Sequence, residues 1–350
     1  MFSRGTVLTL DQFRTTQARL EATGLFSRHH LELSPVEGDR FTVTLRAAER
    51  NGPHLLSWIS GLPYETVQPG FFSLGGKAIH LKSTLRWDSN KRRAHVSVSA
   101  PLKGDPKWGF RVGVDVRGEN WADAAGTFHM RKGEGTFEIH STPSGRWNWT
   151  SGIAVSHRQF SNVPSRGLGL KYVASLNRTL IRDSDRRFYL DSSFALQAGK
   201  TFSANTERFL KVDNSLSMTW HGVSARWRAG RILGSPPFDE LYLVGLDRDS
   251  DLWVRAHSAT TSSGLKNSSF ARRSFIVTNV DFQKLVHDAG FFRLSAGPFL
   301  DAARGPMSSG WIVDAGLELR ATVLGNLTLK LSYGRGIRDG RNAVFLSVPQ

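Results

Sequence analysis

One arginine near the end of a long charged stretch is the residue in this sequence best placed for specific ionic chemistry. Arg255 stands among apolar neighbours at the end of Pro237–His257 (PFDELYLVGLDRDSDLWVRAH). Two carboxylates, Asp281 and Asp301, follow in runs that alternate apolar and polar residues, and residue parity puts both on the polar side. Because a guanidinium fork binds a carboxylate through two parallel hydrogen bonds, we expect Arg255 to pair with one or both.

Arg255 has a second interpretation, as an exposed loop residue. An ion pair at such a position contributes only about 0–1 kcal/mol to stability. On the residues alone this second interpretation is favoured. A separation of more than about 6 Å between Arg255 and both carboxylates would exclude the pairing.

The same stretch also contains a weak likeness to a calcium loop. Asp247, Asp249 and Asp251 have the spacing of the first three ligands of such a loop. Leu252 stands where the loop needs glycine, and Ser258 stands where it needs glutamate. We therefore predict that the protein holds no metal ion.

Other chemical motifs are incomplete. Gly334-x-Gly336 lies in a strand-like run rather than before a helix, so it is not a nucleotide-binding fingerprint. His29 and His30 are adjacent, and neighbouring strand residues point to opposite faces. Serine, histidine and aspartate are all present, but no nucleophile elbow marks a hydrolase site. We predict no enzyme activity and no cofactor; a lipase or protease on the rim of a barrel stays open as an alternative.

Composition limits the possible partners and compartments. The 350 residues carry a formal charge of +16, with 46 Lys and Arg against 30 Asp and Glu, and include no Cys. An anionic partner is expected from that charge, either nucleic acid or acidic lipid headgroups. The basic clusters are scattered and no nucleic-acid motif accompanies them, so we predict no nucleic-acid partner. The absence of Cys excludes disulfides and thiolate sites.

The strands that must position these side chains are predicted from long runs in which apolar and polar residues alternate. From Phe71 onward we count about fourteen runs, many of nine or more residues, where about five or six is typical of soluble sheets. About nine to eleven residues are needed for a tilted strand to cross a bilayer. Charged residues such as Arg111 and Lys211 on the polar face require water there. So many strands would enclose a water-filled lumen.

Aromatic residues distinguish a membrane barrel from a soluble β-protein. Alternation alone does not show whether the apolar face of each strand points outward, as in a membrane barrel, or inward, as in a soluble β-protein. The aromatic residues gather near strand ends, as an interfacial girdle requires. The residues concerned are Trp87, Trp108, Trp147, Trp149, Trp220 and Tyr333. We predict an all-β transmembrane antiparallel barrel, with a soluble β-protein as the alternative.

The chain divides into three predicted parts. Residues 1–50 form a small α+β unit, with a helix over Gln12–Thr23 capped by Asp11 and ended by Gly24, followed by a hairpin. Residues 51–70 form a linker rich in proline and glycine. Residues 71–350 form the barrel, whose first strand is expected near Lys77–Trp87 and whose last is Ala343–Val348. Residues 234–272 form a loop folded into its lumen.

The C-terminal third resembles the BamA-type outer-membrane assembly superfamily, also called bacterial surface antigens. Members have a 16-stranded barrel and an in-folded loop that ends in Val-Arg-Gly-Phe/Tyr; here the motif reads Val254-Arg255-Ala256-His257. Further matches are Asn279-Val280-Asp281-Phe282-Gln283, Phe299-Leu300-Asp301-Ala302-Ala303 and the closing run LTLKLSYGRGIRDGRNAVFLSV. The resemblance favours the pairing of Arg255 inside the lumen with Asp301 and Asp281.

Some motif positions depart from that family. Ala256 and His257 replace the glycine and the aromatic residue, which puts the tight turn and ring packing of the loop in doubt. Gln283 and Ala303 replace two further motif residues. The N-terminal unit resembles the second half of a POTRA domain, through Arg19–Ser27 (RLEATGLFS), and it lacks one helix of the whole βααββ module.

The resemblance implies a barrel in the bacterial outer membrane that inserts or translocates other proteins through a lateral seam and the lumen loop. Its implied partners are unfolded outer-membrane or secreted protein clients, outer-membrane lipid, and periplasmic proteins bound by the POTRA-like unit. A passive pore or anchoring barrel is the alternative function. The first residues (MFSRGTVLTLDQFRTT) contain no signal peptide, so an outer-membrane location implies that the start of this chain is incomplete.

Overall fold

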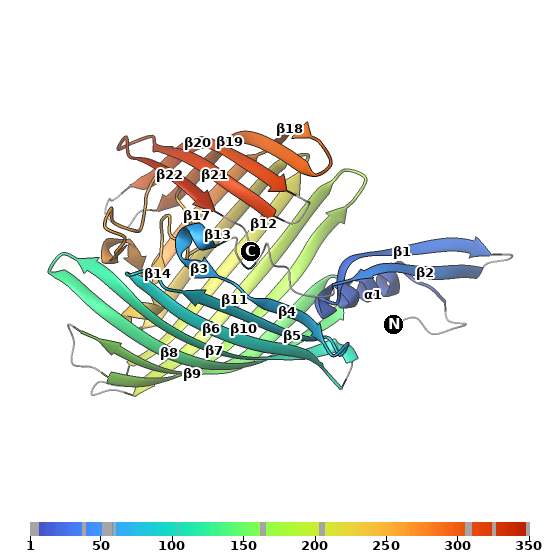
Figure 1. Ribbon diagram of the computed structural model, residues 1–350, viewed down its shortest axis with the longest axis horizontal. Helices are drawn as coiled ribbons and strands as arrows, with labels where there is room; N and C mark the ends of the chain where they lie inside the picture. The colour runs from blue at the N-terminus through green and yellow to red at the C-terminus, as the bar shows by residue number, and fades with distance from the viewer. Residues whose placement is uncertain are drawn as a thin grey trace.

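The computed structural model describes residues 7–36, 40–50, 58, 61–103, 105–161, 166–202, 207–304, 310–323 and 327–347, without the side chains of 27, 28 and 166. It consists of a closed β-barrel with a small α+β unit at one end (Figure 1). Among the described residues, no helix is long and apolar enough to cross a membrane. The turn of the predicted hairpin, at 37–39, and most of the first ten residues of the predicted linker lie outside the described residues.

The α+β unit contains helix α1 (Leu10–Thr23) and the hairpin of β1 (Phe26–Val36) and β2 (Arg40–Glu49). Thr9 is the N-cap residue, because its side chain accepts from the Gln12 amide and Gln12 bonds back in a capping box. The expected cap, Asp11, instead lies in the first turn. Gly24 ends the helix at φ 63°, as its position predicted.

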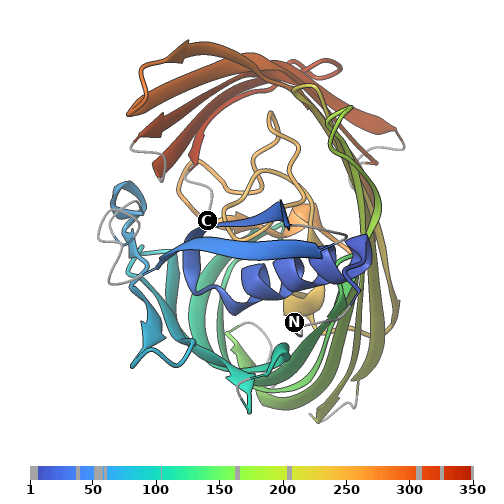
Figure 2. The ribbon, with the colours of Figure 1, turned by 90° about the vertical axis from the view of Figure 1, so that its right-hand side faces the viewer.

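Helix α1 is seated on the adjoining end of the barrel (Figure 2). The Arg19 guanidinium donates to the carbonyls of Thr142 and Pro143, at 3.2 and 3.1 Å. The Gly145 amide donates to the Thr15 hydroxyl at 3.0 Å. The α+β unit therefore lies across this mouth of the barrel, held by polar contacts to one strand-to-strand turn.

The wall of the barrel is built from long antiparallel strands, and β7 and β8 have 19 residues each. Residues 126–144 form the single strand β8. The barrel segments outside the lumen loop are β3 (Thr66–Val67), β4 (Gly70–Leu74), β5 (Ile79–Arg86), β6 (Lys91–Leu102), β7 (Asp105–Asp123), β8 (Gly126–Ser144), β9 (Trp147–Phe160), β10 (Arg166–Asp183), β11 (Phe188–Phe202), β12 (Glu207–Trp220), β13 (Val223–Gly234), β17 (Ser274–Phe282), β18 (Lys284–Asp288), β19 (Phe292–Arg304), β20 (Trp311–Val323), β21 (Leu327–Gly336) and β22 (Asn342–Ser347).

Among the described residues, fifteen wall strands result when these segments are joined by register. β3 and β4 continue one register against β5, and β17 and β18 continue one register against β19. Within the described part of the chain, each wall strand is antiparallel to the next. Fifteen is an odd number, so the first strand and the last run in the same direction. The number lies between the fourteen counted from sequence and the sixteen implied by resemblance.

The first strand of the wall is β3–β4 and not the run near Lys77–Trp87, which forms the second strand, β5. Gln68 and Pro69 separate its two segments, and a proline cannot donate to a ladder. The interruption removes the alternation that would mark a strand, and it lies within the range assigned to the linker. β22 is followed by β3 in the closed strand order, and the Tyr64 hydroxyl donates to the Leu346 carbonyl there.

Apolar residues face outward from the wall and charged residues face the lumen. Val112, Val114 and Val116 on β7 are about half exposed, at 44%, 55% and 54%. Between them in sequence, Asp115 accepts from Arg93 inside the barrel. Contact with lipid is more favourable than contact with water for a surface with this much exposed aliphatic area.

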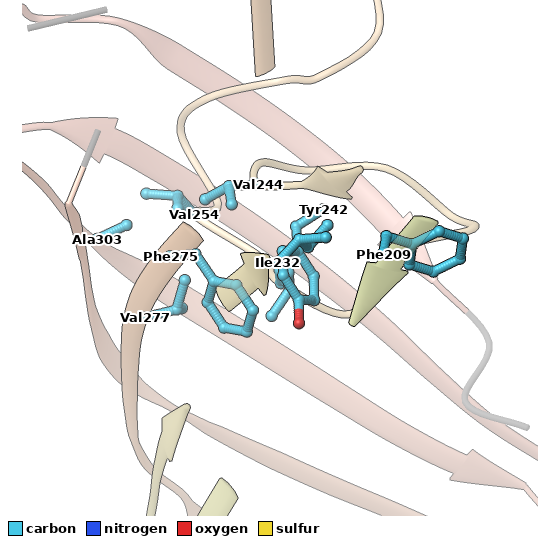
Figure 3. Close-up of a cluster of buried hydrophobic side chains, with 9 residues drawn as sticks. Phe209, Ile232, Tyr242, Val244, Val254, Phe275, Val277 and Ala303 are labelled. Atoms are coloured by element: carbon cyan, nitrogen blue, oxygen red, sulfur yellow. The ribbon is translucent and has the colours of Figure 1, made fainter. Parts of the chain in front are cut away.

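The apolar interior is formed where residues 235–273 pack on the wall (Figure 3). Tyr242, Val244 and Val254 from this segment contact wall residues Phe209, Ile232, Phe275, Val277 and Ala303. A second cluster surrounds Phe238, whose ring packs edge-on against Trp121 and Phe128 at centroid distances of 4.8 and 5.3 Å. The chain itself thus occupies this part of the lumen.

Candidate functional site

The candidate site is the loop between β13 and β17, which is folded into the barrel (Figure 2). Its ends are clipped together by a short pairing of β14 (Tyr242–Leu243) with β16 (Ala271–Arg272). β15 (Lys266–Asn267) adds a parallel pairing to β7 in the wall. The 3-10 turns η2 (Phe238–Glu240) and η3 (Ser268–Phe270) lie at the start and end of the loop.

Arg255 is buried at the tip of this loop and is 5% exposed. Its guanidinium binds Asp301 through both oxygens, with Nη2–Oδ1 at 2.7 Å and Nε–Oδ2 at 2.9 Å. Nη1 reaches Asp281 at 2.6 Å and Glu318 at 3.1 Å. The guanidinium carbon lies 3.6 Å from the centre of the Phe299 ring. The arrangement combines a bidentate pair with cation–π stacking.

Backbone contacts fix the loop tip as well as the side chain. The Arg255 amide donates to Asp301 at 2.9 Å. Asn279 donates to Asp301 at 2.7 Å and to the Trp253 carbonyl at 2.9 Å. Burial would lower the pKa of Arg255, but its hydrogen bonds to Asp301 and Asp281 raise that pKa instead. The Arg255 side chain is therefore a fixed positive charge. The two carboxylate oxygens of Asp301 set the orientation of its guanidinium.

His257 forms a second set of buried contacts next to Arg255. Its ring nitrogens lie 2.9 Å from Asp314 and 2.9 Å from Asp339. The neighbouring amide of Ala256 donates to Asp314 at 2.6 Å. Burial alone would lower the pKa of His257, but hydrogen bonds and charge from Asp314 and Asp339 raise it above the ordinary value of 6.5. An ionic clamp thus occupies the position where the resembled motif has an aromatic ring.

Two glycines of β21 allow the loop tip to lie this close to the wall. A Cβ added at Gly334 would sit 2.9 Å from the Arg255 carbonyl carbon, and one at Gly336 would sit 3.1 Å from the His257 ring. Glycine in the interior of a strand commonly marks such a close backbone approach. The Gly334-x-Gly336 pattern therefore allows the loop to pack against the wall, a role that the sequence alone did not predict.

A third set of ion pairs, which sequence reasoning missed, holds the start of the loop. Lys132 lies 3.0 Å from Asp239 and 3.1 Å from Glu240. Arg158 and Lys171, on the next two strands, each bind one or both of these carboxylates at 3.1–3.2 Å. Burial would raise the pKa of Glu240, but the surrounding lysines and Arg158 lower it, so Glu240 is ionised.

The three aspartates with calcium-loop spacing each pair with a cation of the chain. Asp247 lies 2.6 Å from Lys91, Asp249 lies 2.8 Å from Arg86, and Asp251 lies 2.5 Å from Arg228. Within the described ranges, no group of three or more histidine or acidic side chains is arranged to hold a metal ion. These aspartates therefore act as anchors to the wall.

The loop contacts both flanks of the junction between the last strand and the first. Trp253 packs edge-on against Phe345 of β22, with ring centres 5.8 Å apart. Arg248 lies 3.3 Å above the ring of Tyr64, the residue that bonds to Leu346 of β22. One loop thus links β22 to the N-terminal side of the barrel through the lumen.

Comparison with solved structures shows the fold to which the chain is similar. BamA from Haemophilus ducreyi lacking POTRA domains 1–3 aligns with 100% of this chain and 80% of its own, at TM-score 0.59 and 11% identity. CdiB from Escherichia coli aligns over 98% and 71%, at TM-score 0.61 and 14% identity, and CdiB from Acinetobacter baumannii over 99% and 69%, at TM-score 0.56 and 13% identity. No protein-family model and no curated protein matches by sequence. The chain has the barrel fold of these proteins.

Replacing Asp301 by Asn tests how strongly the pairing holds the loop. Asp301→Asn keeps the side-chain shape but removes the charge that accepts both guanidinium nitrogens, while Asp281 and Glu318 remain. We expect loop docking to weaken by about 2–3 kcal/mol, so that protease cleavage within residues 243–262 accelerates roughly 30–150-fold. Asp288→Asn is the control, because Asp288 forms an ion pair with exposed Arg293 outside the lumen loop. Equal cleavage of the two variants would contradict the role of Asp301.

The raised pKa of His257 predicts that the loop tip docks less tightly at high pH. Protonated His257 satisfies both Asp314 and Asp339, so its contribution is complete below the ordinary pKa of 6.5 and is lost as pH rises through the raised pKa. An NMR titration of the histidine ring carbons will show this resonance, identified by its absence in His257→Gln, titrating above 6.5. A value at or below 6.5 would show that the two carboxylates do not stabilise the imidazolium.

Proposed function

We propose that the chain is an outer-membrane barrel that inserts or translocates other proteins through a lateral seam, with residues 234–272 as its lumen plug. The outward apolar face of the wall and the likeness to BamA and CdiB support a membrane barrel. The proposed activity needs neither a cofactor nor covalent chemistry. Its substrates are unfolded outer-membrane or secreted proteins, and the α+β unit is the surface available to periplasmic partners.

The observation that carries this proposal is the weakness of the closing junction. Among the described strands, β22 has six residues and the first strand, β3–β4, consists of segments of two and five residues, whereas β7 and β8 have 19 residues each. The first and last strands also run in the same direction, and parallel pairing is slightly less stable per residue than antiparallel pairing. Because each ladder bond contributes about 0.5–1.5 kcal/mol, separating these two short strands costs far less than separating long neighbours such as β7 and β8.

An opened junction would expose the unpaired edge of β22. Backbone N–H and C=O groups on such an edge pair readily with an extended segment from another chain. A client strand could then add to the sheet and leave the lumen sideways into lipid, with its backbone groups paired throughout. Bonds to the client replace bonds within the barrel, so the exchange needs no external energy source at this step.

The lumen loop is the element that would couple the junction to the barrel interior. Trp253 contacts the last strand and Arg248 contacts Tyr64 on the other side. The tip of the same loop is bound through Arg255 to β17, β19 and β20. A displacement of the loop would therefore remove the contacts on both flanks of the junction at once.

A passive pore is the second candidate, and the buried loop argues against it. An open channel needs a continuous aqueous path, but Phe238 packs among lumen aromatics and Arg255, Glu240 and Asp247 are buried in ion pairs. Breaking these buried pairs without replacing them would cost several kcal/mol. The loop is better suited to a plug that is displaced during a working cycle than to the lining of a permanent pore.

A reversible cross-link across the junction tests the lateral seam. The chain has no Cys, so Tyr64→Cys/Leu346→Cys carries the only thiols. In proteoliposomes given a urea-unfolded small outer-membrane barrel, we expect a short bis-thiosulfonate linker to stop formation of the protease-resistant client. A reductant should restore it.

The matched control is Tyr333→Cys/Val344→Cys, whose positions are paired within the β21–β22 ladder and do not span the junction. Cross-linking this pair should leave the activity unchanged. Full activity of the cross-linked Tyr64/Leu346 variant would exclude opening at this junction.

A further inference from the structure

Three arginines line a hollow on the outside of the barrel, at the end opposite the α+β unit. Arg231 of β13, Arg272 of β16 and Arg304 of β19 surround a hollow of about 620 Å³. Its other lining residues are mostly small or apolar: Val212, Ala229, Gly230, Ser274, Phe275 and Ile276. The hollow therefore combines a basic rim with an apolar floor.

Strand parity places two of these arginines on the outer face of the wall. Phe275 and Val277 of β17 point into the lumen cluster, so Ser274 and Ile276 point outward. Arg231 is the ladder partner of Ser274, and partners across a ladder share a face. Arg304 follows Ala303, which is fully buried in the lumen cluster, so Arg304 points outward as well.

These arginines have no carboxylate partner in the described part of the chain, in contrast to the lumen arginines. No ion pair joins Arg231, Arg272 or Arg304 to an acidic side chain there. Arg272 donates from Nη2 to the Ser269 carbonyl, while its buried Nε has no hydrogen-bond partner. The adjoining segments 203–206 (SANT) and 305–309 (GPMSS) contain no Asp or Glu. The positive charge of the hollow is therefore left for an external anion.

The position of the hollow matches the headgroup layer of a bilayer. Arg304 is the ladder partner of Trp311, and tryptophan concentrates at membrane–water interfaces. On the side toward the α+β unit, the outward faces continue with exposed apolar residues such as Leu216 and Leu300, as expected within the hydrocarbon layer. This argument rests on the proposed outer-membrane location, and it places the hollow in the leaflet away from the α+β unit.

We propose that this hollow binds the phosphate groups of an outer-leaflet glycolipid. Guanidinium forks bind phosphate oxygens bidentately, and Arg231 and Arg304 stand on strands roughly 10 Å apart, a span that suits a headgroup with two phosphates. The acyl chains would lie along the apolar surface below. The site shares Arg272 with the end of the lumen loop, so it adds a bound lipid to the barrel wall next to the point where the loop leaves it.

Lipid retention in nanodiscs tests this site without any transport assay. The barrel is embedded in phosphatidylcholine nanodiscs containing either diphosphorylated lipid A or its dephosphorylated form, and bound glycolipid is counted by native mass spectrometry. We expect retention of the phosphorylated form only. Arg231→Gln/Arg304→Gln should reduce that retention about tenfold or more, because charge-assisted contacts to phosphate are lost.

Two variants control for charge and for folding. Arg231→Lys/Arg304→Lys keeps the charge and should retain a substantial part of the binding. Arg335→Gln removes an exposed arginine of β21 outside the hollow and should leave retention unchanged. Heat-modifiable migration on gels verifies that each variant is a folded barrel.

Three outcomes would overturn the site. Equal retention of dephosphorylated lipid A by the unmodified protein would show apolar binding without phosphate recognition. Displacement of lipid A by millimolar inorganic phosphate would indicate a free-anion site, and unchanged retention in the Gln variant would place the lipid elsewhere. A barrel that binds lipid A but folds no client would refute the proposed function while leaving this site intact. A chain that does not enter nanodiscs would refute the membrane location itself.

Discussion

The bidentate contact between Arg255 and Asp301 is the interaction on which the interior of this barrel depends. A buried guanidinium is costly unless carboxylates surround it, and here Asp301, Asp281 and Glu318 lie on three successive wall strands, β19, β17 and β20. The same contact therefore fixes the loop tip and ties neighbouring strands to one another. Because the charges are satisfied only when the loop is seated, the seated loop and the ordered wall require each other.

Two further sets of ion pairs extend this constraint around the lumen. The start of the loop is held at Asp239 and Glu240 by strands β8, β9 and β10, and its middle is held at Asp247 and Asp249 by β5 and β6. The loop is thereby attached to opposite parts of the wall. The short strands at the junction carry little of the closing energy, so the loop supplies contacts across the lumen that the backbone ladder does not.

Much of this architecture follows from pattern alone, and the remainder does not for identifiable reasons. Alternation and strand length predicted the barrel, and parity put Asp281 and Asp301 on the face that Arg255 contacts. Parity cannot say which distant strands become neighbours, so Asp314, Glu318 and the cations around Glu240 were not predicted. The first strand was missed because Pro69 interrupts it. Gly334 and Gly336 offered a usable signal, since glycines inside a strand mark a close backbone approach.

Amide hydrogen exchange of the protein in lipid bilayers tests the central claim most directly, namely that the loop is seated in the lumen by buried ion pairs. The account predicts that the amides of Val244, Leu246, Ala256 and His257 exchange as slowly as those of β12 and β13, because these residues are buried and their amides are bonded. Exchange of these amides within seconds, while β12 and β13 stay protected, would contradict it, since the loop would then be mobile inside an otherwise stable wall.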